Sequence, residues 1–140
     1  MYSKILVALD HTSADDSLLP HVTELAKLCG ASLLLVHVAD GWVARYYRET
    51  NLAESEEMRE DRAYLEKRQR EIADLGLPVE SRLAMGDPSA EILRVGDEAK
   101  CDLIAMTSHG HRLIGDIFYG STIEKVRHKT EIPLLIVRAK

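Results

Sequence analysis

At 140 residues the chain has the length of one domain, spanning 1–140, and its balance of apolar and charged residues is that of an ordinary soluble protein. A formal net charge of −5 argues against general affinity for nucleic acid, which needs a basic surface. No apolar run approaches the roughly 20 residues of a membrane span, and the N-terminus lacks the pattern of a signal peptide. We therefore expect a cytoplasmic protein without nucleic-acid or membrane partners, in which Cys29 and Cys101 are reduced thiols.

Five apolar runs predict the strands of a sheet. Continuous apolar stretches of this kind are typical of strands that are buried on both faces of a parallel sheet. Helical segments alternate with them, which is the rhythm of repeated βαβ units. The predicted strands are Ile5–Leu9, Ala31–Val38, Val79–Met85, Cys101–Met106 and Leu134–Val137. The sequence therefore predicts a single α/β domain, although this pattern alone does not give the order of the strands.

The first helix follows the first predicted strand and ends at Gly30, a residue that suits the left-handed conformation at a helix end. Thr12 or Ser13 is its expected N-cap. Pro20 removes a backbone donor and crowds the preceding turn. This helix is therefore expected either to start near Ser17 or to carry a kink.

The next helical segment, Leu52–Leu75, is dense in glutamate and arginine and is expected to form one long helix with a narrow apolar stripe. Three residues at heptad spacing mark the stripe: Met58, Leu65 and Ile72. The third helix follows a turn in which Asp87 is the expected N-cap and Pro88 occupies the first helical position.

The segment after the fourth predicted strand carries the strongest functional signal. It contains Gly110 and Gly120, followed at once by Ser121 and Glu124, whose Ser-x-x-Glu spacing is that of a capping box. This spacing predicts a helix from Ser121 to Lys129. A strand, a glycine-bearing loop and a capped helix N-terminus together form a site for anions, because free backbone N–H groups converge there. We therefore expect a phosphate-bearing ligand.

At these residues the chain resembles the universal stress protein family, whose nucleotide-binding members carry Gly-x2-Gly-x9-Gly-(Ser/Thr). Gly110, Gly120 and Ser121 match the second glycine, the third glycine and the hydroxyl residue, whereas Thr107 stands in place of the first glycine. Further segments resemble the family and follow in the same order: Lys4–Asp10, Val36–Val38, Gly86–Pro88 and Ile132–Val137. The resemblance covers nearly the whole chain, with residues 41–74 the least similar part.

The resemblance implies a doubly wound sheet of five parallel strands in the order 3-2-1-4-5, with helices on both faces. It implies a small cytosolic stress-response protein that binds ATP or another adenine nucleotide in a crevice between strands one and four, with Mg²⁺ bridging the phosphate oxygens. Asp10, whose alternative role is that of a turn or cap residue, and the backbone of Val38 would meet the nucleoside. The full set of expected contacts is Ala8, Asp10, Val38, Met106, Thr107, Gly110, Gly120, Ser121 and Thr122.

An enzyme, either an ATPase or a nucleotidyl transferase, is a less favoured hypothesis. The sequence has no P-loop motif, and no Gly-x-Gly-x-x-Gly opens a helix. Ser108 and Ser121 have no evident base partner for nucleophilic catalysis. His109 and His111 invite a metal site, but no nearby cysteine or spaced carboxylate completes one. A binding protein that acts without turnover is the favoured interpretation.

The alternative within the same fold is a dimeric interaction protein that binds no nucleotide. Leu134–Val137 is apolar and near the end of the chain, and the resemblance implies a homodimer in which this edge strand pairs with its copy. His37 is expected to be a hydrogen-bonded core residue rather than a ligand. The aromatic residues Trp42, Tyr46 and Tyr47 are expected to pack on the domain or a partner chain rather than to stack on a nucleotide.

Overall fold

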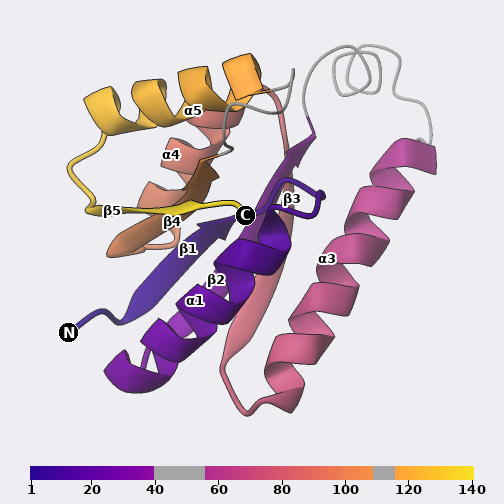
Figure 1. Cartoon of the computed structure of the whole chain (residues 1–140), viewed down its shortest axis with the longest axis vertical. Coiled ribbons are helices and arrows are strands. Elements are labelled where there is room, and N and C mark those ends of the chain that lie inside the picture. Colours follow the sequence, from indigo (N-terminus) through magenta and orange to yellow (C-terminus); the bar gives the residue numbers. More distant parts are fainter. Residues whose placement is uncertain (40–55, 109–115) are drawn as a thin grey trace.

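The computed structural model describes residues 1–39, 56–108 and 116–140, and of residues 116–120 only the backbone. Its strands form one five-stranded parallel sheet in the order β3-β2-β1-β4-β5, which confirms the expected architecture (Figure 1). The strands are β1 (Lys4–Ala8), β2 (Ser32–Ala39), β3 (Val79–Met85), β4 (Leu103–Ser108) and β5 (Leu134–Arg138). The helices are α1 (Asp15–Cys29), α3 (Glu56–Asp74), α4 (Pro88–Glu98) and α5 (Asp116–Lys129).

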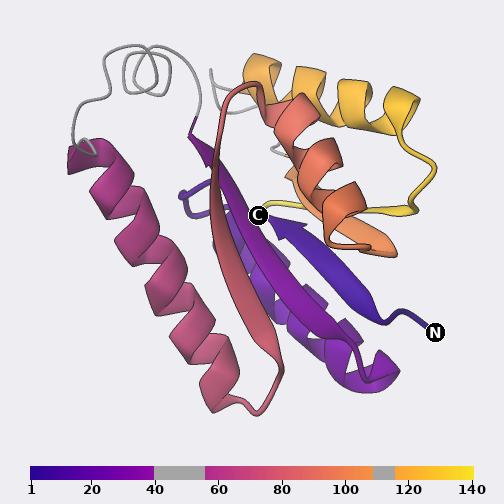
Figure 2. The same cartoon turned by 180° about the vertical axis from the view of Figure 1, so that it is seen from behind.

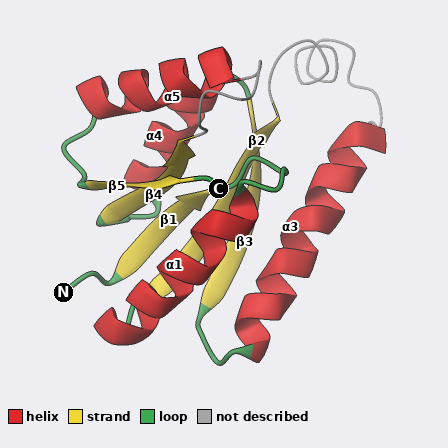
Figure 3. Cartoon of the chain, viewed as in Figure 1, coloured by secondary structure: helices red, strands yellow, loops and turns green. Residues whose placement is uncertain are grey.

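Helices cover both faces of the sheet, as the two opposite views show (Figures 1 and 2) and the colouring by secondary structure makes plain (Figure 3). Ile5 and Val7 of β1 belong to the core that α1 and α3 cover, whereas Leu6 belongs to the core beneath α4 and α5. Successive residues of a strand point to opposite faces, and because helices cover both faces, all three side chains are fully buried. This alternation explains why β1, at the centre of the sheet, is a continuous apolar run.

The N-terminus of α1 differs from the sequence prediction. The N-cap is Ala14, which makes no side-chain cap hydrogen bond, and neither Thr12 nor Ser13 holds that position. The Thr12 hydroxyl instead accepts a hydrogen bond from the Ala14 N–H at 3.2 Å. The expected hydroxyl cap is therefore wrong, although Thr12 still stabilises the turn that leads into the helix.

Pro20 lies inside α1, and the helix begins close to Ser17, which is one of the two expected alternatives. The helix starts at Asp15, whose carboxylate is fully buried and binds backbone N–H groups upstream of the helix. This anchor fixes the first turn ahead of the proline. The other end of the helix is as expected, since Gly30 adopts φ 68° as its C-cap.

The middle helices follow the sequence prediction. In α3 the expected stripe is buried, namely Met58, Leu65 and Ile72. Asp87 is the N-cap of α4, accepting a hydrogen bond from the Ala90 N–H at 3.0 Å, and Pro88 is the first helical residue. No helix in the described part of the chain is long and apolar enough to cross a bilayer. Cys29 and Cys101 are free thiols, as expected.

The start of α5 is the clearest departure from the sequence prediction. The helix covers Asp116–Lys129 and so begins before Ser121. The predicted capping box is wrong, because Ser121 lies within the helix and the Glu124 carboxylate accepts a hydrogen bond from Arg127 at 2.9 Å. A glycine inside a helix costs only about 1 kcal/mol relative to alanine, so Gly120 does not prevent the helix from extending over it.

Candidate functional site

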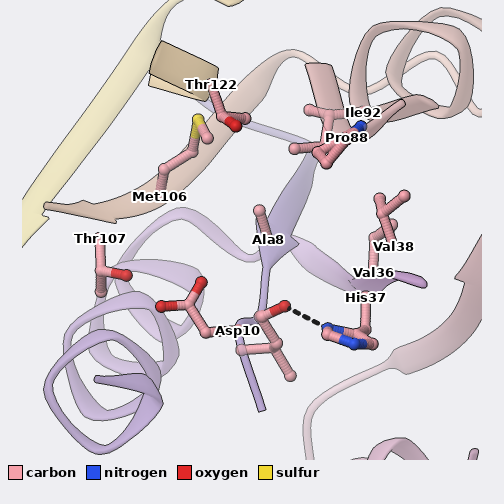
Figure 4. Close-up of a pocket in the computed structure, with 11 residues that line it drawn as sticks. Ala8, Asp10, Val36, His37, Val38, Pro88, Ile92, Met106, Thr107 and Thr122 are labelled. Atoms are coloured by element: carbon pink, nitrogen blue, oxygen red, sulfur yellow. Dashed lines mark hydrogen bonds between the residues drawn. The ribbon is translucent and has the colours of Figure 1, made fainter. Parts of the chain in front are cut away.

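A pocket of about 110 Å³ opens at the carboxyl ends of the central strands (Figure 4). From β1 the chain winds outward through β2 and β3, and it then crosses to β4 and β5 on the other side. The carboxyl ends of β1 and β4 therefore form the topological switch point at which open α/β sheets bind ligands. The described lining residues are Ala8, Leu9, Asp10, Val36, His37, Val38, Pro88, Ile92, Met106, Thr107 and Thr122.

One side of the pocket is apolar. Val36 and Val38 come from alternate positions of β2, Met106 from β4, and Ile92 from the first turns of α4. Ala8 lies between them at the end of β1, where its small side chain leaves room (Figure 4). Apolar walls around a narrow space suit a flat ring, because burying the ring between them removes apolar surface from water.

The other side of the pocket is polar. Asp10 follows β1, and Thr107 lies near the end of the neighbouring strand β4 with its side chain directed toward that of Asp10 (Figure 4). Thr107 is only 4% exposed, and its hydroxyl has no hydrogen-bond partner among the described residues. Thr122, from α5, is also buried and borders the space on the Met106 side. The pocket therefore combines an apolar slot with hydroxyl and carboxylate groups.

The N-terminus of α4 borders the pocket at Pro88 but is occupied by its own cap. The Asp87 carboxylate accepts hydrogen bonds from the Ala90 N–H at 3.0 Å and from the Ser89 hydroxyl at 2.7 Å. These bonds, led by the one from Ala90, hold the pKa of Asp87 below its usual value. The capping carboxylate supplies the negative charge that this helix end attracts.

The turn between β1 and α1, which carries Asp10, is held by a buried carboxylate. Asp15 is fully buried, and its two oxygens accept hydrogen bonds from the Asp10 N–H and the His11 N–H, each at 2.9 Å. The Tyr64 hydroxyl of α3 donates a third bond to Asp15 at 2.6 Å. Burial, together with this bond, raises the pKa of Tyr64 above its usual value, so the phenol stays protonated and remains a donor.

His11 extends this network along α3. It adopts φ 63°, stacks on the Tyr64 ring with 4.1 Å between centroids, and its Nδ1 lies 2.6 Å from the Asp61 carboxylate. Asp61 is only 8% exposed, and its Oδ1 also lies 3.5 Å from Nε2 of His37. His37 Nδ1 donates to the Leu9 carbonyl at 2.8 Å, so His37 is hydrogen-bonded, as expected, but it is partly rather than fully buried and borders the pocket.

The structure brings most of the predicted nucleotide contacts together in one place. Those that line the pocket are Ala8, Asp10, Val38, Met106, Thr107 and Thr122. Ser121 is exposed on α5 and does not line it, and Gly120 lies in the same helix. Gly110 lies outside the described residues, as do His109, His111 and the aromatic segment with Trp42, Tyr46 and Tyr47.

Sequence reasoning missed the second half of the apolar wall and the polar network. Val36 shares a strand face with Val38, so the alternation of β2 could have added it to the predicted site. Ile92 is one of several apolar residues of α4, and Asp61 is one of many charged residues of α3, so the local sequence marks neither for the pocket or its network. Among the described residues no group of three or more His, Cys, Asp or Glu side chains is arranged to hold a metal ion.

Similarity to known proteins extends over the whole chain. The model of the Universal stress protein family matches residues 1–138. The universal stress protein in the QAH/OAS sulfhydrylase 3′ region of Thermus aquaticus is 34% identical over 140 residues, which cover 99% of this chain and 100% of that protein. The solved structure of MJ0577 from Methanocaldococcus jannaschii gives a TM-score of 0.84 at 30% identity, covering 100% of this chain and 98% of that one.

A third similar structure is that of the universal stress protein from Archaeoglobus fulgidus in complex with dAMP. Its TM-score is 0.72 at 22% identity, and the match covers 97% of this chain and 98% of that one. At this identity the match establishes a shared fold.

Proposed function

This chain belongs to the universal stress protein family, and on that premise we propose that it is a binding protein for an adenine nucleotide, with ATP the expected ligand. The observation that carries the proposal is the pocket at the switch point between β1 and β4, with its apolar slot on one side and its hydroxyl and carboxylate groups on the other. The dAMP complex of the Archaeoglobus fulgidus protein supports the same ligand class. The protein would act through its ligand-bound state rather than through turnover, as part of a cytoplasmic stress response.

In this proposal the base occupies the apolar slot. The adenine ring would lie against Val36, Val38 and Ile92, with the backbone of Val38 available for hydrogen bonds to its edge. The sugar would then reach Asp10 and Thr107. The order of groups follows from chemistry, because the ring gains most from apolar contacts and the sugar hydroxyls need polar partners.

The phosphates would lie toward α5, on the side of the pocket bordered by Thr122. Gly110, Gly120 and Ser121 remain predicted phosphate contacts on the strength of the family motif. Mg²⁺ would be held chiefly by phosphate oxygens and water, since it commonly keeps several waters and uses few carboxylates. The described pocket lining fits this arrangement, because Asp10 is its one acidic side chain and it lies with the sugar in this proposal.

The decisive experiment has two arms. Mass spectrometry of small molecules released from freshly purified, heat-denatured protein should detect an adenine nucleotide. Titration calorimetry of nucleotide-free protein with ATP and Mg²⁺ should show saturable binding. If neither the released material nor millimolar ATP, ADP and AMP shows binding, the proposal fails and the alternative of an interaction protein without nucleotide is favoured.

A variant locates the ligand. Ala8→Leu should weaken ATP binding at least about tenfold, because the larger side chain would fill part of the apolar side of the pocket. Ala90→Leu, at an exposed position of α4 close to the same pocket, is the matched control and should bind ATP as the parent does. Unchanged affinity in Ala8→Leu would show that ATP binds elsewhere.

We also propose that the protein is a homodimer through β5. Among the described residues, β5 lies at the edge of the sheet, so one side of its backbone has no neighbouring strand there. Ile136 on this strand is 40% exposed. An apolar edge strand is a template for pairing with an identical strand about a two-fold axis. Sedimentation velocity should give a dimer at micromolar concentration, and a monomer alone would remove this proposal.

A further inference from the structure

The Thr107 hydroxyl is a buried polar group that the described protein leaves without a partner. Thr107 is only 4% exposed, and its Oγ1 makes no hydrogen bond with any described residue. Buried hydroxyls in folded proteins are normally hydrogen-bonded. The buried hydroxyl of Thr23, for comparison, donates to the Pro20 carbonyl at 2.9 Å. The exception at Thr107 therefore needs an explanation.

The position of Thr107 supplies one. Its side chain lines the pocket and is directed toward the Asp10 side chain, from the strand next to the one that Asp10 follows (Figure 4). Valine has nearly the same shape and would suit a buried strand position equally well. A hydroxyl at this place is useful only if a group that enters the pocket meets it.

The two side chains limit the chemistry of that group. An ionised carboxylate only accepts hydrogen bonds, and its two oxygens can accept several, whereas a hydroxyl both donates and accepts. A group that contacts both side chains must therefore donate to Asp10, and it can accept from Thr107. A phosphate or a carbonyl cannot donate, and a phosphate is also repelled by the carboxylate. A hydroxyl group satisfies both requirements.

We propose that Thr107, acting with Asp10, recognises a ribose hydroxyl of the bound nucleotide and makes this chain selective for ribonucleotides over their deoxy analogues. The inference rests on the proposed function, because it assigns a sugar contact within the same pocket. It also gives a role to the one position at which the chain departs from the family's glycine motif. The threonine that occupies space in the pocket thereby provides a contact that glycine lacks.

The test compares ATP with 2′-deoxy-ATP and 3′-deoxy-ATP by titration calorimetry. In the parent protein, at least one deoxy analogue should bind about tenfold more weakly than ATP, since it leaves polar groups of the site unpaired. Thr107→Val keeps the shape of the side chain but not the hydroxyl, and it should reduce this ratio by at least about threefold. Thr107→Ser keeps the hydroxyl and should retain the ratio of the parent.

The outcomes separate this inference from the proposed function. Two outcomes would refute the role of Thr107 and leave the nucleotide site standing. In the first, the parent binds ATP, but Thr107→Val discriminates against the deoxy analogues as strongly as the parent does. In the second, the parent binds all three ligands equally. If the parent binds no adenine nucleotide, the proposed function fails and this inference fails with it. Circular dichroism of both variants should match that of the parent, which removes misfolding as a cause of weak binding.

Discussion

Asp15 and Thr107 are both buried polar residues near the carboxyl ends of the central strands, yet their surroundings differ. The Asp15 carboxylate accepts three hydrogen bonds, from two backbone N–H groups and the Tyr64 hydroxyl. The Thr107 hydroxyl meets no partner among the residues that the structure describes. A buried polar group without a partner costs about 1–3 kcal/mol. Asp15 therefore serves the fold, whereas Thr107 leaves a buried hydroxyl without a described partner at the pocket.

The largest expected effect comes from breaking the satisfied side of this comparison. Asp15→Ala would leave the Asp10 and His11 N–H groups and the Tyr64 hydroxyl without their acceptor. We expect the free energy of unfolding, measured by urea denaturation at pH 7, to fall by about 3–5 kcal/mol. Asp16→Ala is the matched control, because Asp16 is exposed and pairs with Arg68 at the surface, and it should cost less than about 1 kcal/mol. Equal losses in the two variants would mean that the buried network contributes no more to the free energy of unfolding than the surface ion pair does.

A pair of threonine variants sharpens the comparison by predicting opposite signs. Thr23→Val removes a hydroxyl that donates to the Pro20 carbonyl, and it should lower the free energy of unfolding by about 1 kcal/mol. Thr107→Val removes a hydroxyl that has no described partner, and it should raise the free energy of unfolding of the ligand-free protein by about 1 kcal/mol. Thermal and urea unfolding both measure these changes. A loss of stability in Thr107→Val would show that its hydroxyl is already satisfied in the ligand-free protein.

The carboxylate cap at the rim of the pocket should have an effect that fades at low pH. Asp87→Ala should destabilise the protein by about 1 kcal/mol at neutral pH, since it removes the N-cap of α4. Folding depresses the pKa of Asp87, so the charged cap contributes stability above its unfolded value of 3.8 and loses it as the pH falls below that value toward the folded pKa. The difference between parent and variant should therefore shrink below about pH 4.

The fold could be predicted from the sequence because its signals are long and redundant. β1 and β2 are continuous apolar runs, and the stripe of α3 repeats over several turns. The start of α5 could not be predicted in this way. The Ser121–Glu124 spacing is a short local pattern, and Glu124 pairs with Arg127 instead. A pattern of a few residues does not outweigh the hydrogen bonds and packing of a whole helix.

The site was predicted only in part, and the reason again lies in which interactions are local. Asp10 and Thr107 follow or end their strands, so the rule for open α/β sheets brings them together. Two contacts of the polar network join residues that are distant in sequence: Tyr64 of α3 donates to Asp15, and His11 of the turn after β1 contacts Asp61. An acidic residue within a charged helix carries no sign that it will be buried. Side-chain pairs of this kind emerge only once the helices are packed on the sheet.

The bonds from the turn after β1 to Asp15 have a consequence for how that segment moves. The amide protons of Asp10 and His11 lie in no helix or strand, yet each is donated to a carboxylate that solvent does not reach. Such protons exchange with deuterium only when the surrounding structure opens. Opening here means separating α1 and Tyr64 of α3 from the turn, which is a subglobal event rather than the fraying of a loop. The backbone beside the pocket is thus kept rigid before any ligand arrives.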